Sequence, residues 1–315
     1  MVKEYKISFF TKKMSEVLSY IKNNPQETQR LVGVKYEQLE QLIHLASTLH
    51  TQKQQEIEAK KIRIINKGGG RKVKLSTEEQ ILLTLVYLRH LTTFQLLGIQ
   101  FGVSESTAND TFHYWFPLLQ EILPSSLLEQ VKKNASDYEI VQELLTDYEL
   151  IVDSSEQGRE RPEEYAEQKK YYSAKKKSHT FKNQITVLPN GQDIIDVIAG
   201  EPGPKSDITL FRESQKEFEP NQKFQGDKGY IGEPSIKTPT KKPKKGELTL
   251  FQKEKNKEMA QARIFVEHLI RLLKIFRVAS ERFRLNSSKY EQIIMTICGL
   301  VRLRIGALVL PLLNI

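Results

Sequence analysis

The stretch "YELIVDSSEQ", residues 148–157, breaks the pattern of a buried strand that is apolar throughout. Ile151 and Val152 are typical of a buried strand, yet they lead directly into Asp153. A carboxylate at the end of an apolar strand has two interpretations. It is either a turn or cap residue leaving the strand, or a ligand for a cation.

Strand and helix patterns alternate after this stretch. "SHTFKNQITVLPNGQDIIDVIAG" predicts two strands joined at Asn190-Gly191, because Asn-Gly is a strong hairpin signal. "SDITLFRESQKEF" predicts a helix capped by Ser206, "QKFQGDKGY" a fourth strand, and residues 247–276 a long helix. The order strand, strand, strand, helix, strand, helix predicts a mixed sheet of the α/β or α+β class.

Three acidic residues occupy comparable places in these elements. Asp153 is expected to end the first strand, Asp227 to end the fourth, and Glu267 to lie in the long helix. Oxygen ligands suit Mg²⁺, and two such ions can activate water and stabilise the leaving oxygen of a phosphodiester. The alternative for Glu267 is an exposed residue on an amphipathic helix.

The first half of the chain is predicted to be helical and to contain a helix-turn-helix. Ser76 is expected to cap one helix, a second ends at Gly102, and a third starts at Ser104. Gly98 and Ala108 are small where two such helices would approach closely. A purely structural three-helix packing produces the same pattern.

The exposed start of the third helix carries the side chains that would read DNA. Ser106, Thr107, Asn109 and His113 could reach base edges in a major groove, and asparagine can bond adenine through two hydrogen bonds.

Composition favours a polyanionic partner. The chain has 48 Lys and Arg against 39 Asp and Glu, a net charge of +9 and a pI near 9.3. The single cysteine, Cys298, excludes an internal disulfide, and no Cys/His spacing suggests zinc. With so few cysteines we expect a cytoplasmic, nucleoid-associated protein. Arg302 and Arg304 interrupt the apolar stretch near the carboxyl end, so we expect this stretch to be a core helix and the protein to have no membrane partner. The run Gly68–Gly70 lacks phosphate-loop spacing.

Several motifs together make the chain recognisable. These are "GRKVKLSTEEQILLTLVYLR", "FGVSES", "VDSSEQ", "YYSAKKKSHTFKNQ", "GDKGYIG", "ARIFVEHLIRLLKIFR" and "ICGLVRLRI". In this order and spacing they resemble the DDE transposases of bacterial insertion sequences, specifically the insertion-sequence-five group and its Harbinger-like relatives.

The resemblance implies an RNase H-like catalytic domain that cuts DNA and joins it to a target. It implies that Asp153, Asp227 and Glu267 are the catalytic residues and the ligands of two Mg²⁺ ions, with Mn²⁺ as a substitute. Both Asp207 and Asp227 lie in stretches typical of the family. The RNase H-like order favours Asp227, on the fourth strand, while Asp207 would cap the intervening helix or stand near the site as an alternative acid.

Cations near these acids are expected to contact DNA phosphates. Lys175, Lys176, Lys177 and His179 lie in one basic stretch, and Lys274 follows Glu267 by about two helical turns. A solvated charged loop is the alternative for the basic stretch. Relatives usually have glycine where this chain has Ala174, a departure that bears on the local turn and not on the chemistry.

These observations predict three regions: an N-terminal helical region (1–65), a helix-turn-helix region (66–124) and a catalytic domain (125–315). The predicted function is an insertion-sequence transposase that binds double-stranded DNA, both element ends and target, as a homo-oligomer. Two alternatives are a transposase-derived DNA-binding protein that no longer cuts and a covalent tyrosine or serine recombinase. The recombinase would need several arginines around its nucleophile, whereas Tyr171 and Tyr172 have mostly lysine neighbours.

Overall fold

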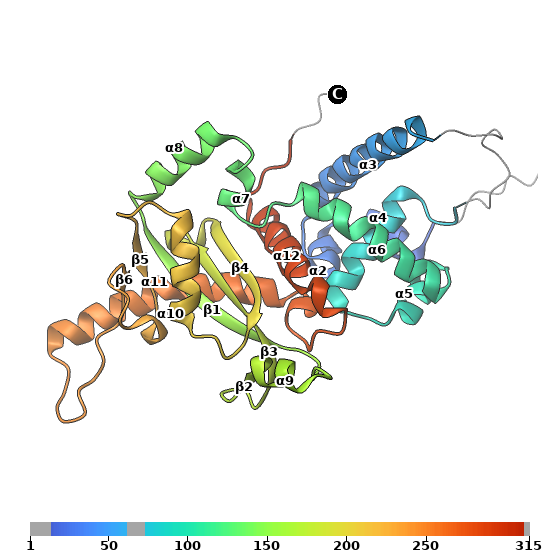
Figure 1. Cartoon of the computed structure of the whole chain (residues 1–315). Coiled ribbons are helices and arrows are strands. Elements are labelled where there is room, and N and C mark those ends of the chain that lie inside the picture. Colours follow the sequence, from blue (N-terminus) through green and yellow to red (C-terminus); the bar gives the residue numbers. More distant parts are fainter. Residues whose placement is uncertain (1–13, 62–72, 312–315) are drawn as a thin grey trace, which may run out of the picture.

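A computed structural model describes residues 14–61 and 73–311 of the chain. The first part of the described chain is helical and forms one end of the molecule (Figure 1). Its α-helices are α1 (Glu16–Asn23), α2 (Thr28–Val32), α3 (Tyr36–Ala59), α4 (Thr77–His90), α5 (Phe94–Phe101) and α6 (Glu105–Ile122).

Helices α4, α5 and α6 begin and end where local chemistry predicts. Ser76 and Glu79 form a capping box at the start of α4, with Ser76 Oγ accepting from the Glu79 amide at 3.2 Å. Gly102 ends α5 in the left-handed conformation, and Ser104 caps α6. The helix-turn-helix expected from the sequence is therefore present.

The turn between α5 and α6 depends on a close contact at Gly98. A Cβ atom there would lie 2.8 Å from the carbonyl oxygen of Val103, which is closer than real Cβ atoms approach backbone. Ala108, on α6, is fully buried. The two small residues singled out in the sequence thus both lie where the helices pack.

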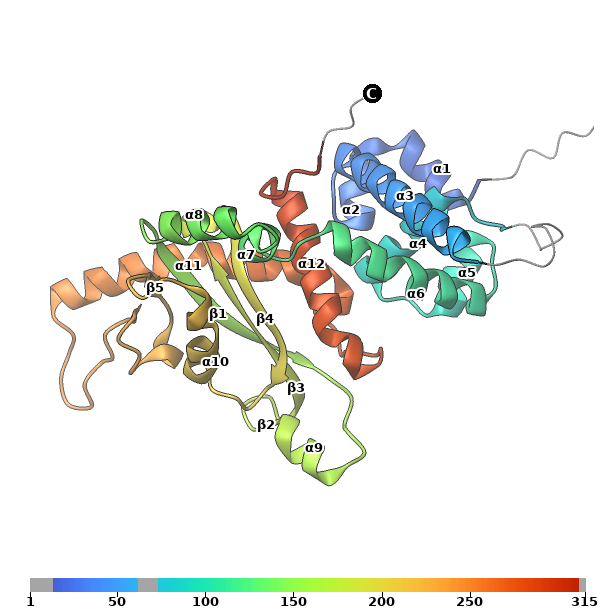
Figure 2. The same cartoon turned by 45° about the horizontal axis from the view of Figure 1, so that its top comes forward.

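The second part of the chain wraps helices around a sheet (Figures 1 and 2). Its elements are α7 (Leu127–Val131), α8 (Ala135–Leu145), β1 (Glu149–Gly158), α9 (Tyr165–Tyr171), β2 (Tyr172–Ser173), β3 (Ser178–Val187), β4 (Ile194–Pro202), α10 (Asp207–Ser214), β5 (Lys223–Gln225), β6 (Ile236–Lys237), α11 (Leu250–Lys274) and α12 (Tyr290–Ile305).

The sheet is mixed, as predicted. Strand β3 pairs antiparallel with both β1 and β4, while β5 runs parallel to β1 and β6 parallel to β5. The antiparallel strands β4, β3 and β1 are thus followed across the sheet by β5 and β6, which run parallel to β1. This is the RNase H-like strand order. The hairpin between β3 and β4 turns at Pro189–Gly191, with Asn190 in the left-handed region at φ 62°.

The first strand corrects one expectation. Asp153 does not end β1, because pairing with β3 continues through Gly158 opposite Thr180. On its other edge, β1 pairs with β5. This pairing ends at Ile151, opposite Gln225, which is two residues before Asp153. Asp153 therefore lies just beyond the point where one edge of β1 becomes free.

Alternation along β1 decides which way Asp153 faces. Leu150 and Val152 belong to a core cluster that also contains Phe211 of α10, whereas Ile151 belongs to the cluster that contains Val266 of α11. Because successive side chains of a strand point to opposite faces, Asp153 shares the face of Ile151 and points toward α11.

The apolar stretch near the carboxyl end forms the core helix α12, as expected. Arg302 is fully buried there and donates to both carboxylate oxygens of Asp193, at 2.6 and 2.8 Å. Its other donors reach the carbonyls of Pro124 and Ser126 and the side chain of Gln130. A buried arginine is tolerable only when its charge and donors are satisfied in this way.

One hydrophobic core joins the two halves. Buried residues of α4 and α6 belong to the same cluster as buried residues of α11 and α12. The predicted boundary at residues 65 and 66 and the run Gly68–Gly70 lie outside the described residues. Among the helices described, none is long and apolar enough to span a membrane.

Candidate active site

Asp153 is a mostly buried carboxylate, with a side chain 16% exposed. Burial raises the pKa of Asp153 to about 6, and the negative charges of Asp227 and Glu267 contribute to the rise. The Ser154 amide, which donates to Oδ1 at 2.9 Å, and the guanidinium of Arg263 act in the opposite direction. Asp227 and Glu267 are thus both close enough to affect the pKa of Asp153.

Arg263 lies between two of these acids. Its Nη2 atom is 3.8 Å from Oδ2 of Asp153 and 3.5 Å from Oε1 of Glu267. The pair with Glu267 joins successive turns of α11, whereas the pair with Asp153 crosses from helix to sheet. A cation therefore already occupies the space between a strand carboxylate and a helix carboxylate.

Asp227 follows β5 and caps the short 3₁₀ helix η4 (Lys228–Tyr230). Its Oδ1 accepts from the amide of Gly229 at 2.7 Å. A Cβ atom at Gly229 would lie 2.8 Å from both Oδ1 of Asp227 and Oδ2 of Asp207. Glycine at this position allows the two carboxylates to approach the same point.

Asp207 does not cap α10, which was one of its two expected places. Ser206 caps the helix, as predicted, by accepting from the Thr209 amide, and Asp207 takes the alternative place near the site. The Asp207 carboxylate points away from the helix end and accepts from Nζ of Lys182 at 2.9 Å. Lys182 is buried and also donates to the carbonyl of Lys205. Asp207 is consequently a site-facing acid with its own counter-charge.

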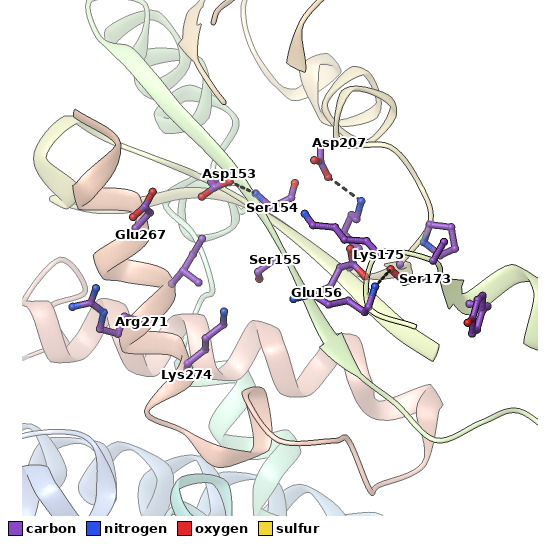
Figure 3. Close-up of a pocket in the computed structure, with 17 residues that line it drawn as sticks. Asp153, Ser154, Ser155, Glu156, Ser173, Lys175, Asp207, Glu267, Arg271 and Lys274 are labelled. Atoms are coloured by element: carbon purple, nitrogen blue, oxygen red, sulfur yellow. Dashed lines mark hydrogen bonds and ion pairs between the residues drawn. The ribbon is translucent and has the colours of Figure 1, made fainter. Parts of the chain in front are cut away.

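A cavity of about 750 Å³ opens between β1 and α11 (Figure 3). Asp153, Asp207 and Glu267 line it, whereas Asp227 is not among its lining residues. The same cavity is lined by cationic side chains from three elements: Lys175, Lys176, Lys182, Arg271 and Lys274. An acidic end bordered by cations suits a phosphodiester, because the cations can hold phosphates while the acids face the reacting group.

The basic stretch forms the tight turn of a hairpin between β2 and β3. Lys175 and Lys176 face the cavity, but Lys177 is not among its lining residues and takes the left-handed conformation at φ 52°. The unusual residue of the turn is thus Lys177 and not Ala174. His179 lies opposite Tyr172 across the hairpin, outside the cavity lining.

Comparisons with known proteins agree with this arrangement. Residues 152–302 match a family model described as "DDE superfamily endonuclease", and residues 73–125 match "Helix-turn-helix of DDE superfamily endonuclease". The chain is 34% identical over 222 residues to "Probable transposase for insertion sequence element IS702" of Microchaete diplosiphon, covering 69% of this chain and 77% of that protein. The chain belongs to the DDE transposases of insertion sequences.

Among solved structures, the transposase is similar to "Mos1 transposase paired-end complex with left transposon end" at 10% identity, covering 73% of this chain and 86% of that chain with a TM-score of 0.19. It is also similar to "Crystal structure of a pre-cleavage Mos1 transpososome" at 12% identity, covering 80% and 84% with a TM-score of 0.17.

Family membership implies that the transposase depends on a divalent metal ion and binds DNA. The donor chemistry fits a hard cation, because Asp153 is a buried carboxylate whose nearest counter-charge is a cation shared with Glu267. In the described part of the chain, however, no three His, Cys, Asp or Glu side chains are grouped closely enough to hold a metal ion. The three predicted acids are therefore near one another, but among the described residues they do not form a group of metal-binding side chains.

The predicted base-reading residues lie at the start of α6. Ser106 and Thr107 are exposed and Asn109 is half-buried. The hydroxyls of Ser106 and Thr107 lie 3.1 and 2.8 Å from Ser104 Oγ. His113 is differently placed, since its Nδ1 is 2.8 Å from Nζ of Lys289. Contact with the second half of the chain thus holds His113 in place.

Two residues of the site were missed in the sequence. Arg263 precedes Glu267 by four residues, a spacing that indicates a contact between them on one helix face. The sequence gives no indication that Arg263 also contacts Asp153 on the sheet. Tyr230 is fully buried; its hydroxyl donates to Gln184 Oε1 at 3.3 Å and lies 2.9 Å from Ser154 Oγ. No local signal distinguishes Tyr230 from an ordinary core tyrosine.

Proposed function

We propose that the transposase binds the ends of its element, cuts a DNA strand with the help of two Mg²⁺ ions, and joins the freed 3′ hydroxyl to target DNA. Asp153, Asp227 and Glu267 are the proposed catalytic residues and metal ligands. When bound, Mg²⁺ or Mn²⁺ would activate water and stabilise the leaving oxygen of the phosphodiester. The observation that carries the proposal is the cation already shared by Asp153 and Glu267 beside a cation-lined cavity.

The cations of the cavity would hold the DNA backbone. Lys175 on the β2–β3 turn lies across the cavity from Lys274 on α11 (Figure 3), and Lys176 lines the same cavity, so one strand of DNA could be held from both sides. Lys177 and His179 belong to the same hairpin and would contact the backbone beside the cavity. Phosphate contacts of this kind position DNA without reading its sequence.

Sequence reading is proposed for the start of α6, through Ser106, Thr107 and Asn109. These side chains lie at the amino-terminal end of the second helix of the helix-turn-helix, which is the end that meets base edges in such motifs. An element has two ends, so we propose that two or more copies of the chain assemble on DNA. Association with the nucleoid would follow from this binding.

The decisive test compares Asp153→Asn with a matched control in another strand. Asp196, on β4, is also an aspartate whose pKa burial raises to about 6, but it lies outside the cavity. The probe is a DNA duplex made from the sequence that flanks the coding region. Asp153→Asn should bind this probe as the wild type does and lose Mg²⁺-dependent nicking, whereas Asp196→Asn should retain both.

The same experiment separates the proposal from its alternative. A transposase-derived protein that no longer cuts would bind the probe and leave it intact in every variant. Nicking by Asp153→Asn at the wild-type rate would instead show that the metal ligands lie elsewhere.

The reading role of α6 is tested with point variants, because a truncation before residue 120 would expose the core that α4 and α6 share with α12. Asn109→Ala should lower the preference for the element end over unrelated DNA by about 10-fold. Glu121→Ala, on the last turn of the same helix, is the control. An unchanged preference in Asn109→Ala would count against base reading by this residue.

A further inference from the structure

A basic arm, defined as residues 238–249, projects from the sheet domain between β6 and α11 (Figures 1 and 2). It contains four lysines and one glutamate within twelve residues, "TPTKKPKKGELT". Its net charge of +3 is one third of the +9 carried by all 315 residues. The proposed active site uses none of these lysines.

The arm is anchored at its base and buries little of itself. The amide of Thr240 donates to Oδ1 of Asn256 at 2.8 Å, and Nδ2 of Asn256 donates back to the Thr240 carbonyl at 3.0 Å. This reciprocal pair ties the arm to the second turn of α11. Residues 241–247, beyond this anchor, are all exposed. The basic arm is attached to α11 but does not contribute to the hydrophobic core, so a role in binding a partner accounts for it better than a role in stability does.

Three lysines of the arm are available to a partner. Lys242 and Lys253 share Glu247, at 2.9 and 3.0 Å, which draws the end of the arm toward α11. Lys241, Lys244 and Lys245 make no ion pair with any carboxylate of the described residues. Three exposed positive charges close together repel one another, and this repulsion is relieved when the lysines bind a partner that carries several negative charges.

We propose that the basic arm binds duplex DNA phosphates outside the catalytic cavity, which extends the proposed function beyond the site. Glu267 lies seventeen residues after Leu250 along α11, a length of about 25 Å at the rise of an α-helix. That length corresponds to roughly seven base pairs along B-DNA. In both views the arm extends in the same general direction as α9 and β2, so DNA held by the β2–β3 turn could run toward it.

Charge favours DNA over a second copy of this chain as the occupant. Leu250 and Phe251 are 85% and 72% exposed at the end of the arm, and such side chains can also meet protein. A second copy carries the same net positive charge, however, and would be repelled by the lysines.

The test measures the salt dependence of DNA binding for Lys241→Gln, Lys244→Gln and Lys245→Gln combined. Removing one phosphate contact makes the slope of log K against log salt shallower by about 0.9, so we expect a decrease in its magnitude of about 2 to 3. The matched control combines Lys133→Gln, Lys216→Gln and Lys223→Gln, which removes the same charge from exposed sites off the arm and outside the cavity. Its slope should change by less than about 1.

DNA length then locates the contact. On a duplex that ends about five base pairs from the cleavage site, too short to reach the arm, the arm variant and the wild type should bind alike. On a duplex of about thirty base pairs the arm variant should bind more weakly and lose backbone protection roughly seven base pairs from the cut.

Equal slopes for the arm variant and the control would overturn the proposal. So would an unchanged slope accompanied by a loss of self-association in sedimentation without DNA, because the arm would then be a protein interface. Nicking by the wild type is recorded on the same probes. If the wild type nicks and the slopes are equal, only the arm proposal fails; if the wild type does not nick, the proposed function itself fails.

Discussion

Arg263 places its Nη2 atom 3.8 Å from Oδ2 of Asp153, across the gap between α11 and β1. The same guanidinium reaches Glu267, and its buried Nε atom has no hydrogen-bond partner among the described residues. The positive charge of Arg263 therefore offsets the repulsion between the carboxylates of Asp153 and Glu267. Its guanidinium does not use all of its hydrogen-bond donors in doing so. A divalent cation binding these acids would have to displace it.

Arg263→Met should make the metal-free transposase less stable and its response to Mg²⁺ larger. Without the guanidinium, Asp153 and Glu267 lose their shared cation, at a cost of about 1 to 2 kcal/mol near neutral pH. Thermal unfolding with EDTA and with Mg²⁺ measures both effects. Arg271→Met, which removes another arginine of the cavity wall, is the control. A smaller Mg²⁺ response than in the wild type would show that Arg263 does not compete with metal.

Gly229→Ala should impair metal-dependent nicking with little loss of stability. The new Cβ would lie 2.8 Å from carboxylate oxygens of both Asp207 and Asp227, so the two acids would have to separate. Gly229 is exposed, and no core packing is disturbed. Gly158→Ala is the control, because its nearest neighbour would be 4.0 Å away. Nicking rates and unfolding temperatures of both variants check the prediction, and wild-type nicking by Gly229→Ala would contradict it.

Asp207→Asn should reduce nicking less than Asp227→Asn does. Asp207 is paired with Lys182, whereas Asp227 directly affects the pKa of Asp153. Single-turnover nicking rates over a range of Mg²⁺ concentrations would rank the two variants. The reverse ranking would exchange their roles and make Asp207 the second ligand.

Asp196→Asn should stabilise the protein at neutral pH. Burial raises the pKa of Asp196 to about 6, with Glu217 adding to the rise and Lys132 opposing it. The folded state thus binds the proton more tightly than the unfolded state, so stability falls as pH rises from about 4 to about 6. The variant should equal the wild type near pH 4 and exceed it by roughly 3 kcal/mol at pH 7.5.

Urea unfolding of wild type and variant at these two pH values measures the difference directly, because all other groups contribute equally. A variant that is less stable than the wild type at pH 7.5 would mean that ionised Asp196 makes a favourable contact. That result would also disqualify it as the control for Asp153→Asn.

Most elements of the fold were predictable because their signals are local. Ser76, Ser104 and Ser206 cap helices with their own side chains, and Asn190 adopts the left-handed turn that joins two strands. The order of strands and helices after residue 148 was likewise correct. The small additions β2, α9 and β6 were missed, since elements of two to seven residues carry too little periodicity.

Local signals were enough to predict the helix-turn-helix, the mixed sheet and three acids on elements that could meet, because capping, turns and hydrophobic periodicity act between near neighbours. Three relationships required the folded chain: β5 leaves β1 just before Asp153, Asp207 meets Asp227 at Gly229, and Arg263 stands between Asp153 and Glu267. These relationships depend on strand register and on how α11 packs across the sheet. Local sequence patterns do not predict contacts between residues that are this far apart in the chain.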